Sequence, residues 1–168
     1  MNESEVPRAL VIGVGNPDRG DDGVGPAIAH RLRTRAPSGM SIFELGGDAL
    51  ALIEAWEGFS FVILVDAIEP TTKPGEIYRF DLRNSQLPIT AMPHSSHAFG
   101  LAETIELARS LGRLPQALIA YLIEGERFET GAPLSPASER AADLVADKIL
   151  AEFATINEAF RAGAGRHA

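Results

Sequence analysis

The feature that most constrains the fold is the apolar run FSFVILVDA at residues 59–67. Both its odd and its even positions are apolar, so a strand formed here has to be buried on both faces. Central strands of parallel sheets have this pattern, because helices cover both faces of such sheets. Shorter apolar runs at residues 8–14, 40–45 and 117–123 predict further strands, and residues 76–80 predict a short edge strand.

Helical patterns alternate with these predicted strands. Apolar residues recur at helical spacing after the Asp21–Asp22 pair, after Asp48, between residues 98 and 111, and after Ser135. This alternation predicts an α/β fold with helices on both faces of a mostly parallel sheet. A length of 168 residues favours a single domain, which we place at residues 1–155, followed by a flexible tail at 156–168.

Composition excludes several classes of site and partner. The sequence has no cysteine, which rules out disulfides, thiolate nucleophiles and cysteine-ligated metals. Its formal net charge of −8 argues against broad binding to nucleic acid. No apolar stretch approaches the roughly 20 residues that a membrane-spanning helix needs. The acidic start MNESEVPRAL lacks the pattern of a signal peptide, so we expect a cytoplasmic protein.

The first predicted strand runs into the segment VIGVGNPDRGDDGVG, which is rich in glycine and aspartate. Gly13 and Gly15 match the start of a dinucleotide fingerprint, but Asp18 occupies the place of its third glycine. Asp21 and Asp22 would put negative charge where a phosphate has to lie. Phosphate binding is therefore disfavoured. The other interpretations are a turn with solvated capping aspartates, or a site for a cation.

Three further side chains are candidates for the same edge of the sheet. Asp66 ends the central strand, and the segment PHSSHAFG carries His94 and His97 just before a predicted helix. Ligands bind outside the carboxyl ends of the strands in open α/β sheets, where the loop with Asp22 also lies. Oxygen and nitrogen ligands without sulfur suit nickel, manganese or zinc. A turn aspartate and incidental loop histidines remain the alternative, and these residues alone define no reaction.

Four motifs in this order resemble the maturation endopeptidases of [NiFe] hydrogenases. They read GVGNPDRGDDGVGP, FVILVDAIEP, HSSHAFGLAE and EGERFETGAPLSP, and the resemblance extends from residue 10 to about 153. It implies three layers around a twisted, mostly parallel sheet of about five strands. It also implies an aspartic-type endopeptidase that removes the C-terminal extension of a hydrogenase large-subunit precursor after nickel insertion.

The resemblance implies roles for particular residues. Asp22, Asp66 and His97 occupy the positions of the proposed nickel ligands, and Asp22 and Asp66 are also the candidate catalytic groups. His94 lies outside the motif. Asp21 is expected to point away from the site and to cap a helix. The nickel belongs to the precursor, so the implied enzyme needs no metal of its own. The precursor is its expected partner, and the enzyme is expected to be a monomer.

One position departs from the family pattern. Some relatives place an aspartate directly before the Gly46–Gly47 turn, where this chain has Leu45. The nearest carboxylates are Glu44 and Asp48, and the sequence assigns no role to Glu44, while Asp48 is expected to cap its helix. The two glycines still suit a close approach by a substrate backbone.

Two other functions fit the same residues. A non-catalytic chaperone that senses nickel in the hydrogenase precursor would use the same cleft without cutting the chain. A free-standing metallohydrolase would hold its own metal tightly, which is disfavoured because three ligands without supporting hydrogen bonds bind metal weakly.

Overall fold

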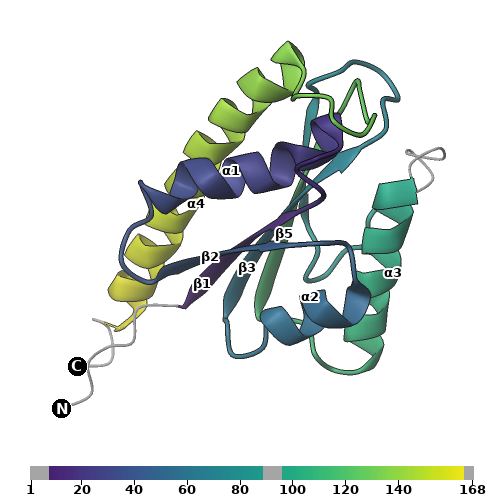
Figure 1. The fold of residues 1–168 in the computed structure, drawn as a ribbon. Coiled ribbons are helices and arrows are strands. Elements are labelled where there is room, and N and C mark those ends of the chain that lie inside the picture. The colour runs from purple at the N-terminus through teal and green to yellow at the C-terminus, as the bar shows by residue number, and fades with distance from the viewer. Residues whose placement is uncertain (1–7, 89–95, 165–168) are drawn as a thin grey trace.

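The computed structural model describes residues 8–88 and 96–164, which form one five-stranded sheet between two layers of helices (Figure 1). The strands are β1 (Ala9–Val14), β2 (Met40–Leu45), β3 (Phe61–Ile68), β4 (Ile77–Asp81) and β5 (Ala117–Glu124). They lie in the order β2-β1-β3-β5-β4. Only β4 is antiparallel to its neighbour. The predicted α/β fold with a mostly parallel sheet is confirmed.

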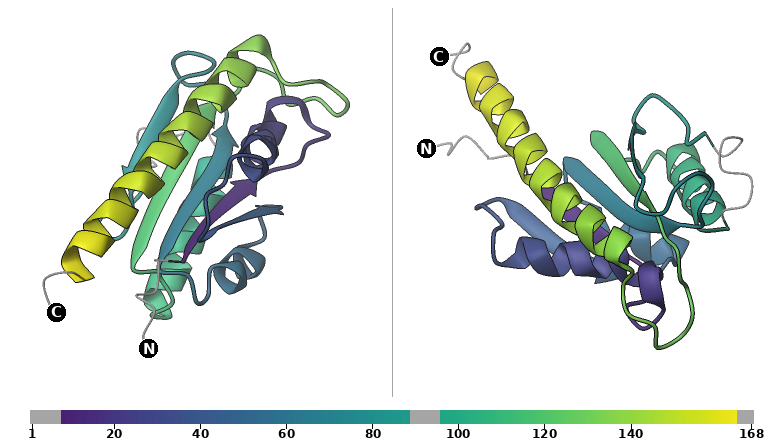
Figure 2. Two further views of the ribbon diagram at one scale, coloured as in Figure 1. Left: turned by 90° about the vertical axis from the view of Figure 1, so that its left-hand side faces the viewer. Right: turned by 90° about the horizontal axis from the view of Figure 1, so that it is seen from above.

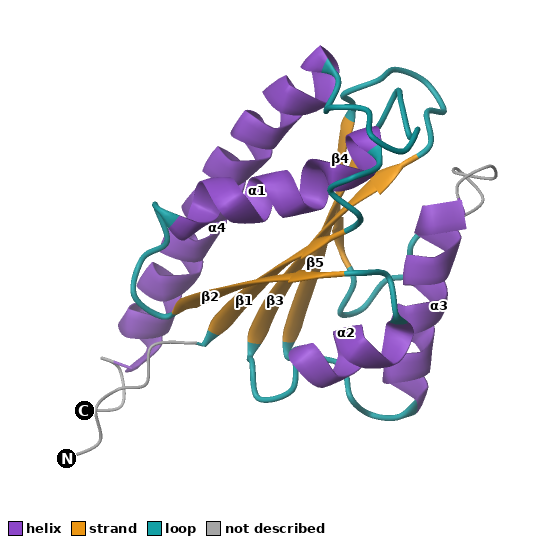
Figure 3. Cartoon of the chain, in the orientation of Figure 1, coloured by secondary structure: helices purple, strands orange, loops and turns teal. Residues whose placement is uncertain are grey.

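The described residues also form four α-helices and one short 3-10 helix, of which all but the last in the chain lie between strands (Figure 3). They are η1 (Gly20–Gly23), α1 (Val24–Arg33), α2 (Ala49–Ala55), α3 (Ser96–Ser110) and α4 (Pro136–Ala164). α1 and α4 cover one face of the sheet, and α2 and α3 cover the other, as the views in Figure 2 show. This is the three-layer arrangement that the alternating strand and helix patterns predict.

β3 is the centre of the sheet, and all of its residues are buried. Alternate side chains serve the two helical layers: Val62 and Leu64 pack under α2 and α3, whereas Ile63 and Val65 pack under α1 and α4. The part of the predicted run that forms β3, residues 61–67, is therefore buried on both sides. The predicted edge strand is also confirmed, because β4 pairs with β5 alone.

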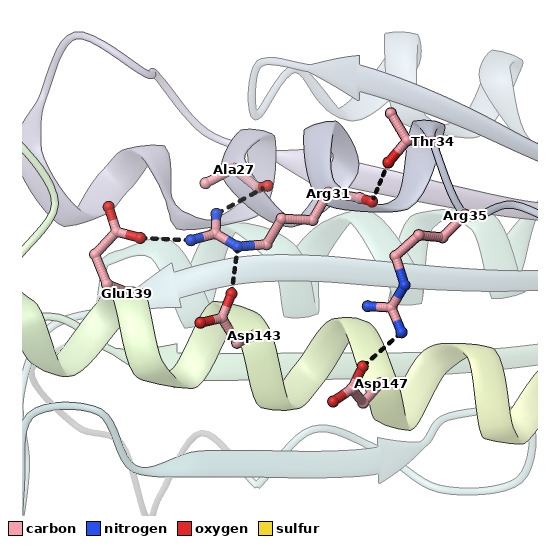
Figure 4. A network of polar contacts seen from close by, with 7 residues as sticks. All are labelled: Ala27, Arg31, Thr34, Arg35, Glu139, Asp143 and Asp147. Atoms are coloured by element: carbon pink, nitrogen blue, oxygen red, sulfur yellow. Dashed lines mark hydrogen bonds and ion pairs between the residues drawn. The ribbon is translucent and has the colours of Figure 1, made fainter.

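Ion pairs join α1 and the residues just after it to α4 across the solvent-facing side of their contact (Figure 4). Arg31 donates from Nε to Asp143 Oδ1 at 2.7 Å and pairs with Glu139, and Arg35 donates to Asp147 Oδ1 at 2.7 Å. These side chains are partly exposed, so each pair contributes at most about 1 kcal/mol. The apolar stripe of α4 beneath them supplies more of the packing energy.

α4 continues past the point where the sequence predicted a flexible tail. The helix extends to Ala164, and Ile156 packs against the core one helical turn after Phe153. The apolar stripe thus carries the helix into the segment 156–164, while residues 165–168 lie outside the described part of the chain. Among the described residues, no helix is both long enough and apolar enough to cross a membrane.

The start of α1 lies against the sheet with backbone in direct contact with backbone. A Cβ atom added to Gly25 would come within 2.4 Å of the Val14 carbonyl oxygen and 2.7 Å of the Val65 carbonyl oxygen. A Cβ atom added to Gly13 would lie 2.3 Å from the Gly25 oxygen. These two positions require glycine because no side-chain atom fits between the helix and strands β1 and β3.

We predict that Gly25→Ala destabilises the protein by about 2 kcal/mol or more, since the new methyl group would force α1 away from two strands. Chemical denaturation of the purified variant measures this loss. A variant as stable as the unsubstituted chain would show that α1 can shift without cost and that the contact is not a constraint.

Candidate active site

β1 and β3 separate at the carboxyl edge of the sheet. Their pairing ends at Gly13 and Val65, and Asp66 is the next residue of β3. β1 leads through α1 to β2 on one side, whereas β3 lies on the other, so the strand order reverses here. Ligand sites of open α/β sheets form at such points. Asp66 is 4% exposed, and one of its carboxylate oxygens accepts a hydrogen bond from the Ala67 backbone N–H at 2.8 Å.

Asp22 reaches the same point from η1. Its Oδ2 accepts a hydrogen bond from the Asn16 backbone N–H at 3.2 Å, and the residue is 3% exposed. Gly15 makes this return possible, because a Cβ atom there would lie 1.9 Å from the Asp22 carbonyl oxygen. The glycine-rich loop therefore folds Asp22 back onto the end of β1.

Asp22 and Asp66 line one cavity of about 310 Å³. The Gly46–Gly47 turn after β2 forms another part of its wall. Gly100, Leu101 and Thr104 line it from α3. The structure thus brings two of the three predicted metal-binding side chains to one cavity at the predicted edge of the sheet.

The third predicted ligand belongs to the first turn of α3. Position 97 comes three residues before Gly100 and four before Leu101, two of the residues with which α3 lines the cavity. The side chain of His97 and the whole of His94 lie outside the described part of the structure. Among the side chains that are described, no three histidines or carboxylates form a metal site.

Asp21 points away from the cavity, as expected, but it does not cap a helix of its own. Gly23 is the N-cap of α1, and neither Asp21 nor Asp22 caps η1 or α1 through a side chain. Instead, the Asp21 carboxylate accepts backbone N–H groups of Ser135 and Glu126, each at 2.7 Å, and of Arg127 at 3.2 Å. It therefore ties the loop before α4 to the loop that carries Asp22.

The electrostatics of Asp21 follow from these contacts. Burial raises the pKa of its carboxyl group, but the backbone hydrogen bonds from Glu126, Ser135 and Arg127 outweigh burial and hold the pKa below the ordinary 3.8. Asp21 is therefore ionised at neutral pH although its side chain is fully buried.

Glu124 is a second anchoring carboxylate, and it was not predicted from the sequence. It ends β5, is fully buried, and accepts hydrogen bonds from the backbone N–H groups of Thr71, Thr72 and Lys73. The hydroxyl of Tyr78 donates to it at 2.7 Å. An acidic residue directly after an apolar strand was the signal that identified Asp66, and the same signal was present at Glu124.

Burial raises the pKa of Glu124, but hydrogen bonds from the Thr71 and Tyr78 side chains and from the Thr72 and Lys73 backbone outweigh it and lower the pKa from 4.5 to about 2. A lowered pKa stabilises the folded state above pH 4.5. This stabilisation, on the order of 3 kcal/mol, is lost as the pH falls toward 2.

We predict that Glu124→Gln lowers the free energy of unfolding by about 2–3 kcal/mol at pH 7, because the uncharged amide loses the charge-assisted hydrogen bonds that the carboxylate accepts from the backbone N–H groups. The variant should also lose less stability than the unsubstituted chain between pH 4.5 and pH 2. Denaturant titrations across this pH range measure both effects. Glu139→Gln, at an exposed ion pair, is the control, and equal pH profiles for all three proteins would contradict the assignment.

The two carboxylates nearest to Leu45, the position where some relatives have aspartate, make local structural contacts. Asp48 caps α2, because its Oδ1 accepts the Ala51 backbone N–H at 2.8 Å. Glu44 pairs with Arg33 of α1. Neither residue is among those that line the cavity. The predicted cap at Asp48 is confirmed.

Gly100 is a glycine that the packing of the helix does not require. It is exposed within α3, and a Cβ atom added to it would meet no atom within 4 Å. Glycine inside a helix costs stability relative to alanine. Its bare backbone leaves the cavity wall open beside Thr104, whose hydroxyl donates to the Gly100 carbonyl oxygen at 2.9 Å.

We predict that Gly100→Ala raises the free energy of unfolding by about 0.5–1 kcal/mol, since the methyl group removes backbone entropy from the unfolded chain and meets no neighbour. Chemical denaturation measures the gain. A loss of stability would mean that α3 needs glycine for its own packing.

Comparison with known proteins assigns the family. A family model described as hydrogenase maturation protease matches residues 26–152. The chain belongs to the hydrogenase maturation protease family. The match spans α1 through most of α4, so it includes Asp66 and the cavity wall formed by α3. The class of activity is therefore that of a peptidase.

Individual relatives agree with this assignment. The chain is 31% identical over 134 residues to the hydrogenase expression/formation protein HupD of Bradyrhizobium diazoefficiens, covering 77% of this chain and 69% of that protein. It is 28% identical to the hydrogenase 2 maturation protease of Escherichia coli, covering 86% and 89%. The solved hydrogenase maturating endopeptidase HybD of E. coli superposes with a TM-score of 0.72 at 24% identity, covering 88% and 93%, and supports the fold.

Proposed function

We propose that this protease removes the C-terminal extension of a [NiFe] hydrogenase large-subunit precursor once nickel has been inserted. The observation that carries the proposal is the pair of buried carboxylates, Asp22 and Asp66, on one cavity at the strand-order reversal. Membership of the maturation protease family supplies the class of substrate. The nickel ion enters as part of the substrate.

Asp22 and Asp66 are proposed to recognise that nickel together with the imidazole of His97. Carboxylate and imidazole ligands suit nickel, and both carboxylates line the cavity, each held by a hydrogen bond from a backbone N–H group. A precursor without nickel presents nothing to these polar groups and binds weakly. Recognition of the ion thus explains why processing would wait for metal insertion.

Cleavage of the peptide bond needs an activated water, a polarised carbonyl and a protonated leaving amine. We propose that either Asp22 or Asp66 accepts the proton of the attacking water, which is the basis for the aspartic-type assignment. The substrate's nickel would polarise the scissile carbonyl if the two come into contact. In the alternative, the three side chains only recognise nickel, and strain in the bound precursor promotes cleavage.

The expected location in the cytoplasm, the monomeric state and the absence of a nucleic-acid partner stay predictions. The formal net charge of −8 supports the last of these.

We predict that Asp22→Asn and Asp66→Asn keep the fold but lower processing of nickel-loaded precursor by at least about a hundredfold, as loss of a general base does. His97→Ala tests the imidazole in the same way. Mass spectrometry of the precursor measures the loss of its C-terminal peptide. Asp143→Asn, at the exposed pair between α1 and α4, is the matched control and should process normally.

Two outcomes would contradict the proposal. Normal trimming by an Asp22 or Asp66 variant would remove that residue from the mechanism. Equal trimming of nickel-loaded and metal-free precursor by the unsubstituted protease would show that the ion is not the recognition element. Circular dichroism of each variant confirms that it has folded.

A further inference from the structure

β2 forms one edge of the sheet and turns backbone groups outward. The Ala9 N–H donates to the Gly39 carbonyl at 3.0 Å, and the Gly15 N–H donates to the Leu45 carbonyl at 3.0 Å. With the parallel register between these points, Ser41, Phe43 and Leu45 direct their backbone groups toward β1. Ile42 and Glu44 alternate with them and direct theirs away from the sheet.

No strand in the described part of the chain pairs with this edge, so its outward backbone groups are available to another strand. β2 is the last strand on its side of the sheet, and its sequence, MSIFEL, contains no proline. Its single charged residue, Glu44, is paired with Arg33 of α1. Phe43 remains 40% exposed. Edge strands are normally protected by charge, proline or a covering element, because they otherwise pair with another chain.

β2 leads directly to the cavity through the Gly46–Gly47 turn. A Cβ atom at either glycine would meet no atom within 4 Å, and neither glycine has a positive φ angle. The fold therefore places no steric demand for glycine here. Because glycine has no side chain, the two residues present exposed backbone on the wall of the cavity that Asp22 and Asp66 also line.

We propose that the C-terminal segment of the precursor binds in extended form as an added strand along the outer edge of β2. This inference rests on the proposed function and specifies how the substrate reaches the site. The outward groups of Ile42 and Glu44 would pair with the substrate backbone, and the bare Gly46–Gly47 turn would let the chain pass into the cavity. From Ile42 to Gly46 such a track is about 13 Å long.

An added strand would explain how the protease recognises a segment mainly by its backbone. Main-chain hydrogen bonds supply affinity in this binding mode, and side-chain contacts supply preference. Alternate substrate side chains would face the exposed ring of Phe43 on one side and the Glu44–Arg33 pair on the other. This binding mode requires that the C-terminal segment is not already paired with a strand of the precursor itself. A second copy of this chain could also pair with β2, but only a substrate accounts for the continuity with the cavity.

Residue-resolved amide hydrogen exchange tests the proposal. The full-length Asp22→Asn protein, which should cut slowly and lacks one proposed nickel ligand, is mixed with nickel-loaded precursor at concentrations that saturate binding, and exchange is followed by NMR. Exchange at Ile42 and Glu44 should slow by at least about tenfold on binding, as newly formed hydrogen bonds protect amides. The amides of Ser41 and Phe43 already face β1 and are the internal control.

Precursor binding without protection at Ile42 and Glu44 would overturn the proposal. Exchange at both positions could also slow with rising protease concentration in the absence of precursor. That result would overturn the proposal, because it would show that β2 pairs with β2 of a second copy of this protein. Failure of the unsubstituted protease to trim the precursor would instead contradict the proposed function, so the two failures are distinguishable.

Substitutions in the Gly46–Gly47 turn give a second test, in which Asp22 and Asp66 stay unchanged. Gly46→Val and Gly47→Val should leave the melting temperature nearly unchanged, because the added atoms enter open space. Each should raise the KM for precursor by at least about tenfold, since a branched side chain blocks close approach of the substrate backbone. Asp143→Asn is again the control. Folded valine variants with an unchanged KM would overturn the proposed route.

Discussion

The whole site depends on contact between backbone and backbone where α1 meets β1 and β3. Gly13 and Gly25 allow that contact, and Gly15 allows the following loop to fold back over the end of β1. Because of this packing, Asp22 reaches the point at which β1 and β3 diverge, next to where Asp66 lies. A side chain at any of these glycines would separate the helix from the sheet and Asp22 from the cavity.

Four buried carboxylates lie at this edge of the sheet, and they fall into two pairs with different contacts. Asp21 and Glu124 each accept several backbone N–H groups and fix a loop, which lowers their pKa values and keeps them ionised. Asp22 and Asp66 line the cavity. The anchoring pair adds fixed negative charge near the cavity, and such a field favours the approach of a cation. The proposed recognition of a metal ion on the substrate would benefit from this arrangement.

Local pattern was sufficient to predict the strands, the layers and the shared edge of Asp22 and Asp66, because each depends on apolar periodicity and on strand direction. Contacts made by distant loops could not be predicted. Asp21 fits a helix cap by sequence, yet its partners lie more than a hundred residues away at Glu126, Arg127 and Ser135. The extension of α4 was missed because its alanine-rich end resembles a flexible tail until Ile156 is seen to pack against the core.

The bond between Asp21 and the loop before α4 has a consequence for how the protein tolerates change. Asp21 and Asp22 are adjacent, so one peptide unit connects the loop anchor to the cavity. Gly20 lies so close to Arg127 that a Cβ atom would come within 2.4 Å of its carbonyl oxygen. Insertions or deletions between β5 and α4 would therefore displace the Asp22 carboxylate, although Asp22 is distant from this loop in the sequence. Inactivating mutations should therefore occur in this loop as well as around the cavity.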